Sequence, residues 1–412
     1  MRETKSILLT ACLVLAAAHA VAQTELEGTT AGGAFYRIAV PTNWTPENGL
    51  VIWNHGFDLD PPDANVDLGP LVDIQLSEGY AVAASSYRLN GWAVFKTNKD
   101  NKALVDVFRA RVGNPSHVIV TGASLGGAVT AANLEKGKLG NVVGAFTFCG
   151  AMAGSRSWDG ALDLRLIYDQ VCQNVPESEI PGGATGLPEG SNLSQDEILE
   201  RVNACTGVGE PRRQRSRTQK DNLERLLELT QLPEEFIETD MIFATQALAD
   251  LIFDRGKLKG RQGVENAHVD YGDAEINENI ERVEGKRKGL RRLAKNFTPK
   301  GKVGNAKIVS IHTDKDGLVI VENESEYASV VPEDKLTVGI VVEQEPSHCG
   351  FSVSEVLSGW ESLRSWIAGG AQPTVDDLQT NCNALSGLFG GPCRFDPGFV
   401  IPDMDGRIRP RD

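Results

Sequence analysis

The chain has 412 residues, with 56 acidic and 41 basic side chains and a formal net charge of −15 at pH 7. This length allows a large core plus an insertion or a small second domain. An acidic chain without a sustained basic stripe binds nucleic acid poorly, so we expect no nucleic-acid partner.

The N-terminal 22 residues are typical of a secretory signal. Arg2 and Lys5 precede an apolar run over 7–18, which ends in the small-residue pattern AVA at 20–22. We therefore expect cleavage after this pattern and a secreted or periplasmic protein. A lipoprotein-type match at Cys12 is the weaker interpretation, because the apolar run continues past it. We expect no membrane span, since the run is too short to remain as one and no later stretch is long and apolar enough.

The region up to residue 150 alternates strand and helix patterns. The strand patterns lie at 33–56, 80–88, 118–121 and 142–150, and helix patterns lie at 68–78, 100–111 and directly after Gly126. Strands that alternate with helices predict an α/β fold with a mostly parallel sheet, covered by helices on both faces.

The most informative stretch is HVIVTGASLGGAVTA at 117–131. A β-branched run meets Gly122-Ala123-Ser124-Leu125-Gly126, and a small-residue helix pattern follows. A strand, a sharp turn with one serine and then a helix is the setting of a G-x-S-x-G nucleophile elbow. Ser124 is therefore the candidate nucleophile, and the Leu125 N–H is positioned to bind a developing oxyanion.

The pattern changes at about residue 151. From there to about 302, Pro/Gly-rich loops and charged amphipathic helices replace the strand signals, and NAKIVSIHT at 305–313 then resumes the sheet. This arrangement predicts a helical insertion instead of an independent domain. In chain order we expect a signal peptide, the first half of the core, a helical cap insertion, the second half of the core, and a loop-rich C-terminal extension that wraps the core (1–22, 23–150, 151–302, 303–370 and 371–412).

Of the 7 cysteines, six follow the predicted signal. An even number in an exported protein favours three disulfides, although six cysteines allow fifteen connectivities. We favour Cys382–Cys393 as a local link, Cys172–Cys205 within the insertion, and Cys149–Cys349 by elimination. Because no two cysteines form a C-x-x-C pair, we expect no metal site.

These motifs together resemble the α/β-hydrolase superfamily over roughly 33–150 and 303–368, with the helical insertion where that family commonly carries its cap. The family's catalytic order along the chain is nucleophile, acid and then histidine. Downstream of the acid candidates at 314–316, His348 is the only histidine. It lies in a loop ahead of the amphipathic segment SEVLSGWESLRSWI, as the family's histidine does, and is the candidate base.

The acid follows the strand KIVSIHT, where Asp314 and Asp316 are both available. In the family the acid usually precedes a short x-x-Val segment, which favours Asp316 and leaves Asp314 as the alternative. The acid would hold the imidazole tautomer and stabilise the imidazolium.

The resemblance implies that the Phe57 N–H completes the oxyanion hole with Leu125, and that no metal or organic cofactor is needed. The neighbouring His55 would hold the loop in shape. His312, inside a strand pattern, is expected to be a hydrogen-bonded core residue.

A narrower resemblance is to tannase and feruloyl-esterase-type enzymes, which have one cysteine before the serine and another after the histidine. His348-Cys349 matches the second, whereas Ala123 stands in place of the first. Cys149, at the end of the next strand, could supply an equivalent brace.

The leading hypothesis is a secreted hydrolase that cleaves a small-molecule or polymeric carboxylic ester by a Ser-His-Asp mechanism. Aromatic residues near the expected site, Tyr87, Trp92 and Trp158, are candidates for the walls of the substrate pocket. A serine peptidase on the same fold is the nearest alternative. A non-catalytic binding protein is the third, although such proteins usually lose a member of the triad.

Overall fold

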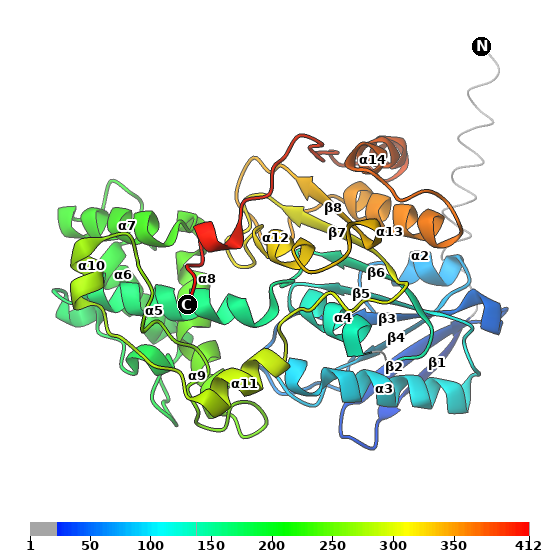
Figure 1. Ribbon diagram of the computed structural model, residues 1–412, viewed down its shortest axis with the longest axis horizontal. Helices are drawn as coiled ribbons and strands as arrows, with labels where there is room; N and C mark the ends of the chain where they lie inside the picture. The colour runs from blue at the N-terminus through cyan, green and yellow to red at the C-terminus, as the bar shows by residue number, and fades with distance from the viewer. Residues whose placement is uncertain (1–22, 137, 412) are drawn as a thin grey trace, which may run out of the picture.

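The computed structural model describes residues 23–136 and 138–411. Figure 1 shows a central sheet with helices above and below it, and a group of helices that extends from one end of the sheet. The predicted signal peptide, with Cys12, lies outside the described residues.

The sheet has eight strands in the order β1-β2-β4-β3-β5-β6-β7-β8. The two pairings of β2 are antiparallel, and those that join β4 through β8 are parallel. The strands are β1 (Gln23–Thr29), β2 (Phe35–Pro41), β3 (Leu50–Asn54), β4 (Ala81–Ser85), β5 (Val118–Ala123), β6 (Val142–Phe148), β7 (Lys307–Thr313) and β8 (Leu336–Val341). This order and these directions define the α/β-hydrolase fold, so the predicted fold class is confirmed.

The central strands are buried on both faces of the sheet. Every residue of β3 (LVIWN) and of β4 (AVAAS) is buried, and so are the first five residues of β5. Continuous apolar and β-branched runs of this kind are what a parallel sheet covered on both faces requires.

Helices cover both faces of the sheet (Figure 1). One face packs against α3 (Val94–Arg111) and α4 (Leu125–Lys136), and the other against α2 (Val72–Ser77), α13 (Val353–Ile367) and α14 (Val375–Phe389). The buried Leu357, Trp360 and Leu363 of α13 recur every three residues, so one stripe of that helix faces the sheet. The short α12 (Asn323–Ala328) follows β7.

The segment between β6 and β7 is helical. No strand interrupts 151–302, a range that the structure describes throughout. Its helices are α5 (Ser157–Cys172), α6 (Gln195–Thr206), α7 (Arg217–Thr230), α8 (Ile237–Ile242), the π-helical η6 (Phe243–Ala247), α9 (Leu248–Phe253), α10 (Ala274–Asn279) and α11 (Arg287–Lys295). We call this segment the cap.

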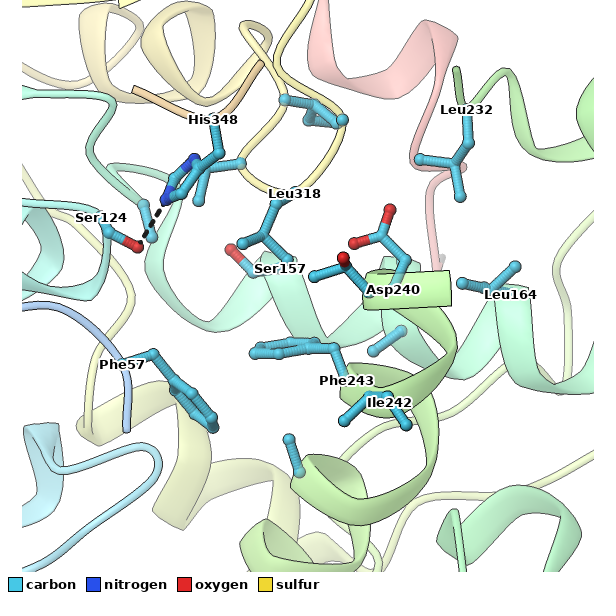
Figure 2. Close-up of a pocket in the computed structure, with 18 of the residues that line it drawn as sticks. Phe57, Ser124, Ser157, Leu164, Leu232, Asp240, Ile242, Phe243, Leu318 and His348 are labelled. Carbon is cyan, nitrogen blue, oxygen red and sulfur yellow. Dashed lines mark hydrogen bonds between the residues drawn. The ribbon is translucent and has the colours of Figure 1, made fainter. Parts of the chain in front are cut away.

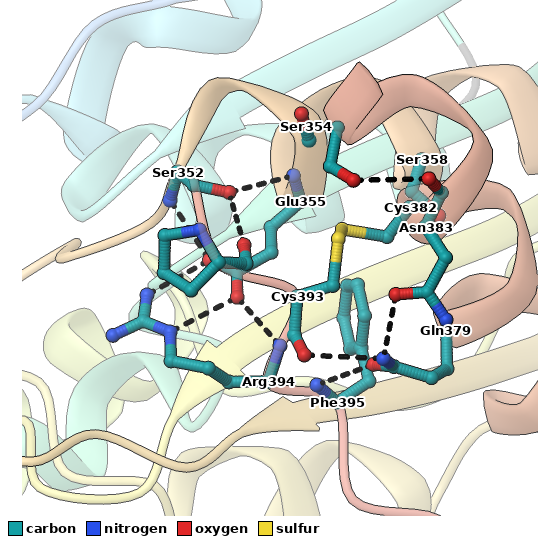
Figure 3. Close-up of a disulfide and its surroundings, with 12 residues drawn as sticks. Ser352, Ser354, Glu355, Ser358, Gln379, Cys382, Asn383, Cys393, Arg394 and Phe395 are labelled. Carbon is teal, nitrogen blue, oxygen red and sulfur yellow. Dashed lines mark hydrogen bonds and ion pairs between the residues drawn. A yellow bond between two sulfur atoms is a disulfide. The ribbon is translucent and has the colours of Figure 1, made fainter. Parts of the chain in front are cut away.

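The C-terminal extension differs from the loop-rich tail that the sequence analysis expected, because it contains the 15-residue helix α14. The Cys382–Cys393 disulfide ties this helix to the segment that follows it (Figure 3). That segment continues the sheet: the Val342 N–H donates to the Arg394 carbonyl at 3.0 Å, and the Asp396 N–H donates to the Ile340 carbonyl at 3.0 Å.

The last described residues leave the core and reach the cap (Figure 1). Arg411 forms an ion pair with Asp163 of α5 at 3.0 Å, and Arg156 binds Asp405 at 2.7 Å. We call residues 404–411 the strap. Arg407 of the strap also faces Glu322 of the core at 3.5 Å, so the strap links cap and core in addition to the two chain connections between them.

Within the described ranges, no helix is both long and apolar enough to cross a membrane.

Candidate active site

Ser124 lies on the turn between β5 and α4. Its φ is +55°, in the left-handed region, and this conformation turns its side chain out of the sheet. The glycines on either side are required for close approach. A Cβ on Gly122 would lie 2.3 Å from the Gly126 carbonyl oxygen, and one on Gly126 would lie 2.0 Å from the Asn54 carbonyl oxygen. The turn therefore has the geometry of a nucleophile elbow.

His348 lies next to this serine. Its Nε2 is 3.0 Å from Ser124 Oγ, and its Nδ1 is 2.7 Å from Asp316 Oδ2. Because a carboxylate only accepts hydrogen bonds, Nδ1 carries the proton and Nε2 is free to accept one from the serine. The three side chains come from the ends of β5 and β7 and from the loop after β8. They form one continuous line of hydrogen bonds.

Asp316 is held in a fixed orientation below the histidine. Its side chain is fully buried. Oδ1 accepts the backbone N–H groups of Leu318 at 3.0 Å and Val319 at 2.9 Å, so Oδ2 remains for the imidazole. Asp314 is used elsewhere, because its Oδ1 accepts the N–H of Glu343 at 2.8 Å. Of the two acid candidates, Asp316 is therefore the one beside His348.

The loop that carries His348 is anchored on both sides. The Cys149–Cys349 disulfide ties it to the end of β6, with the two Cα atoms 5.2 Å apart. Arg394 of the C-terminal extension donates to the Gly350 carbonyl at 2.7 Å and pairs with the buried Glu355 at the start of α13 (Figure 3). These contacts restrict the histidine, and catalytic geometry tolerates little looseness.

The loop after β3 lies against the elbow. A Cβ on Gly56 would be 3.4 Å from Ser124 Cβ, so this backbone borders the serine directly. Leu125 is the first residue of α4, and the first N–H groups of a helix have no partner within it. The neighbouring Phe57 packs its ring on Phe243 of the cap at 5.1 Å. The two backbone positions expected to form the oxyanion hole therefore border the same space.

His55 supports this loop from behind. Its ring stacks on Tyr87 at 4.1 Å, and its Nδ1 is 2.9 Å from the Gly56 carbonyl oxygen. Burial lowers the pKa of His55, so its imidazole is neutral near pH 7. This contact pattern supports a structural role for His55.

A second histidine is buried behind the acid. His312 Nε2 donates to the Val319 carbonyl at 2.7 Å, and Nδ1 lies 3.1 Å from Glu324 Oε1. Burial opposes charge on this ring, but the hydrogen bond and charge of Glu324 raise the pKa of His312 above its usual value. His312 is thus the hydrogen-bonded core residue expected from the sequence, and it braces the turn after Asp316.

A cavity of about 780 Å³ opens from Ser124 and His348 into the cap. Figure 2 shows these two residues at one end, Leu164 and Leu232 at the other, and Asp240 between them. Most of the wall is apolar. The aromatic and large aliphatic side chains of the wall include Phe57, Trp92, Leu125, Ile242, Phe243 and Leu318.

Two of the three predicted pocket-wall aromatics are corrected by the structure. Trp92 lines the cavity, but neither Tyr87 nor Trp158 does, and both are fully buried. Tyr87 stacks on His55 instead. Trp158 stacks behind Phe243 at 4.6 Å, and the cap phenylalanine takes the place at the cavity wall. The packing of two sequence-distant helices decides which ring faces the cavity, and no local pattern encodes it.

The sequence analysis also missed polar residues on the cap side of the cavity, including Ser157, Asp240 and Arg407. A signal for one of them exists in the sequence. Asp240 is three or four residues from Ile237 and Ala244, so it interrupts the apolar face of a predicted helix. Ser157 and Arg407 have no such signal.

Among the described residues, Cys149, His348 and Cys349 form a cluster of potential metal ligands. Both sulfur atoms belong to the disulfide and are not thiolates, the form that binds metal. The cross-link itself explains why the three residues lie together.

The other two disulfides, Cys172–Cys205 and Cys382–Cys393, also join the pairs that the sequence favoured. The first links α5 to α6 within the cap.

No protein-family model and no curated protein sequence matches the chain. Among solved structures, the chain is similar to lipase A of Candida antarctica in its closed state, with 12% identity and a TM-score of 0.44 over 94% of this chain and 83% of that one. It is also similar to the rice cell wall degrading esterase LipA from Xanthomonas oryzae, with 14% identity and a TM-score of 0.39 over 84% and 88%. A third is the esterase RhEst1 from Rhodococcus sp., with 13% identity and a TM-score of 0.38 over 84% and 98%.

Proposed function

We propose that this protein is an exported serine hydrolase that cleaves carboxylic esters through an acyl-enzyme. The observation that carries the proposal is the Ser124–His348–Asp316 line, with its distances of 3.0 Å and 2.7 Å. Its support is geometric: a nucleophile, a base with the correct tautomer and a buried orienting acid lie at one end of a cavity large enough for an ester.

In the first half of the reaction, Ser124 Oγ attacks the ester carbonyl carbon while its proton moves to His348 Nε2. The negative charge that develops on the carbonyl oxygen is stabilised by the backbone N–H groups of Leu125 and Phe57. When the tetrahedral intermediate collapses, the C–O bond to the alcohol breaks and His348 returns the proton to the leaving oxygen.

In the second half, a water molecule replaces the alcohol. His348 takes one proton from this water as it attacks the acyl carbon, and then returns it to Ser124 Oγ as the acid leaves. Asp316 remains ionised throughout and stabilises the imidazolium that forms in each half. The two N–H donors that its Oδ1 accepts keep the carboxylate aligned.

The character of the cavity favours an ester with a sizeable apolar portion. A volume of about 780 Å³ exceeds what a short acyl group fills, and the wall beside the serine is aromatic and aliphatic. The substrate is therefore a bulky small-molecule ester or a segment of an ester polymer. The three disulfides support export, because such cross-links persist in oxidising compartments.

The test is labelling by a fluorophosphonate together with turnover of 4-nitrophenyl esters. Wild-type protein should be labelled and should hydrolyse the esters. Ser124→Ala should lose the label and lose activity by a factor of about 10⁶. Ser329→Ala, on an exposed residue at the end of α12, is the matched control and should behave as wild type.

Three results would redirect the proposal. Labelling that persists in Ser124→Ala would remove this serine from its role. Faster turnover of amino-acid nitroanilides than of esters would identify the serine peptidase instead, and a protein that neither reacts with the probe nor hydrolyses either substrate would be the non-catalytic binding protein.

A further inference from the structure

The cavity contains buried polar atoms with nothing to bind. Asp240 Oδ2, Ser157 Oγ and Arg407 Nη2 are all buried, and none has a hydrogen-bond partner within residues 23–136 and 138–411. All three residues line the cavity. They come from three separate segments, α8, the start of α5 and the strap, and all three face the same cavity.

Asp240 is the most informative of the three. It is 8% exposed, and its carboxyl group points from α8 into the cavity between Leu318 and Leu232 (Figure 2). A buried polar group without a partner costs roughly 1–3 kcal/mol of stability. An apolar side chain at this position would match the neighbouring apolar face of α8 and avoid that cost. The carboxyl group is therefore not explained by folding.

The other polar groups suit a small, uncharged ligand group. One nitrogen of the Arg407 guanidinium already faces Glu322, at 3.5 Å, while its Nη2 is free to donate. The Ser157 hydroxyl both donates and accepts. Burial, and then the nearby charge of Asp316, raise the pKa of Asp240 well above its usual value. A protonated carboxyl also donates and accepts.

We propose that Asp240, Ser157 and Arg407 form a polar subsite that binds a hydroxyl group of the substrate, away from the ester carbonyl. A hydroxyl group can donate to one of these atoms and accept from another, which a plain alkyl chain cannot. A carboxylate is disfavoured, because Asp316 lies close by and Glu322 already pairs with Arg407. The inference rests on the proposed function and names its substrate class: hydroxylated esters.

The experiment compares matched esters that differ by one hydroxyl. One series has the hydroxyl at successive carbons of the acyl chain, and a second series has it on the alcohol. At one position, wild-type kcat/KM should exceed that for the unsubstituted ester by about tenfold or more, because an analogue without the hydroxyl leaves the buried polar atoms unpaired. Asp240→Leu should bring this ratio close to one, whereas Asp240→Asn, which keeps a donor and an acceptor, should retain most of it.

The matched control is Asp221→Leu, on an exposed residue of α7 in the same cap, which should keep the wild-type ratio. A second readout does not require turnover: Ser124→Ala protein should bind the favoured hydroxy acid or hydroxylated alcohol more tightly than its unsubstituted counterpart, as measured by calorimetry. This readout separates the two proposals, since it tests the subsite even if the esters are not cleaved. The inference is overturned if no hydroxyl position is preferred, or if Asp240→Leu keeps the wild-type ratio.

Discussion

The two sides of the cavity differ in how their buried carboxyl groups are bound. We call the side formed by the core the core wall, and the side formed by the cap and the strap the cap wall. On the core wall, Asp316 accepts two backbone N–H groups and the imidazole of His348. On the cap wall, Asp240 Oδ2 has no partner among the described residues. Both carboxyl groups are buried, so burial alone does not distinguish them.

This difference shows which wall has its side-chain hydrogen bonds formed before a substrate binds. On the core wall, the side chains of Ser124, His348 and Asp316 are hydrogen-bonded to one another, so their geometry does not depend on what is bound. The cap wall leaves polar atoms free, at a cost in stability that a bound ligand would remove. The core wall is therefore suited to chemistry and the cap wall to recognition.

Apart from Ser124→Ala, the largest loss of activity should come from a substitution of Asp316, on the core wall. Asp316→Asn should lower kcat by about 10⁴, because the amide favours the wrong imidazole tautomer. Asp314→Asn is the matched control and should have little effect, since an amide oxygen can still accept the Glu343 N–H. Steady-state ester hydrolysis measures both. Equal losses in the two variants would contradict the assignment of the acid.

The next largest effect should come from the disulfide that anchors the histidine loop. Replacing Cys149 and Cys349 together by alanine opens a cross-link between residues 200 apart and should cost about 5 kcal/mol of unfolding free energy. It should also lower kcat in the fraction that remains folded. Denaturant unfolding and ester hydrolysis report the two effects.

Replacement of Cys382 and Cys393 is the comparison for that variant. Its residues are only 11 apart, so the expected cost is smaller, about 3 kcal/mol. If this second variant lost as much kcat as the first, the Cys149–Cys349 cross-link would have no special role in positioning the histidine.

The smallest effect should be a gain in stability instead of a loss. Asp240→Leu should raise the unfolding free energy by about 1–3 kcal/mol at pH 7, because it removes an unpaired buried carboxyl group. Burial raises the pKa of Asp240, the charge of Asp316 adds to this upward shift, and the charge of Arg407 opposes it without reversing it.

The stabilisation should depend on pH. Below the unfolded-state pKa, near 4, both states of wild-type protein hold the proton and ionisation costs nothing. As the pH rises, the unfolded state ionises first, so wild-type stability falls and the advantage of the leucine variant grows. Denaturant titrations at pH 4 and pH 7 test this, with Asp221→Leu as the exposed control. An advantage that shrank toward pH 7 would contradict the upward pKa shift.

Much of the fold could be predicted because its signals are local. The continuous apolar runs of β3 and β5, the glycines around Ser124 and the loss of strand patterns in the cap are all readable within short windows. By contrast, β1, β8 and α14 were missed. Thr374 and Asp377 form a capping box at the start of α14, and this signal was available in the sequence.

The same distinction between signals along the chain and contacts made only by tertiary packing applies to the candidate site. Ser124, Asp316 and His348 could be named because a family order fixes where each one falls along the chain. The cap wall could not, because Ser157, Asp240 and Arg407 come from segments that only tertiary packing brings together. Trp158 illustrates the limit: Phe243 stacks over it and takes its place at the cavity.

The Cys149–Cys349 cross-link has one more consequence. The two cysteines stand immediately before and well after the cap along the chain, so the chain loop that the cross-link closes contains the whole insertion. Helices within that loop can drift in sequence, lengthen or be exchanged while Ser124 and His348 keep their spacing. Such an arrangement favours the evolution of new specificities on an unchanged reaction centre.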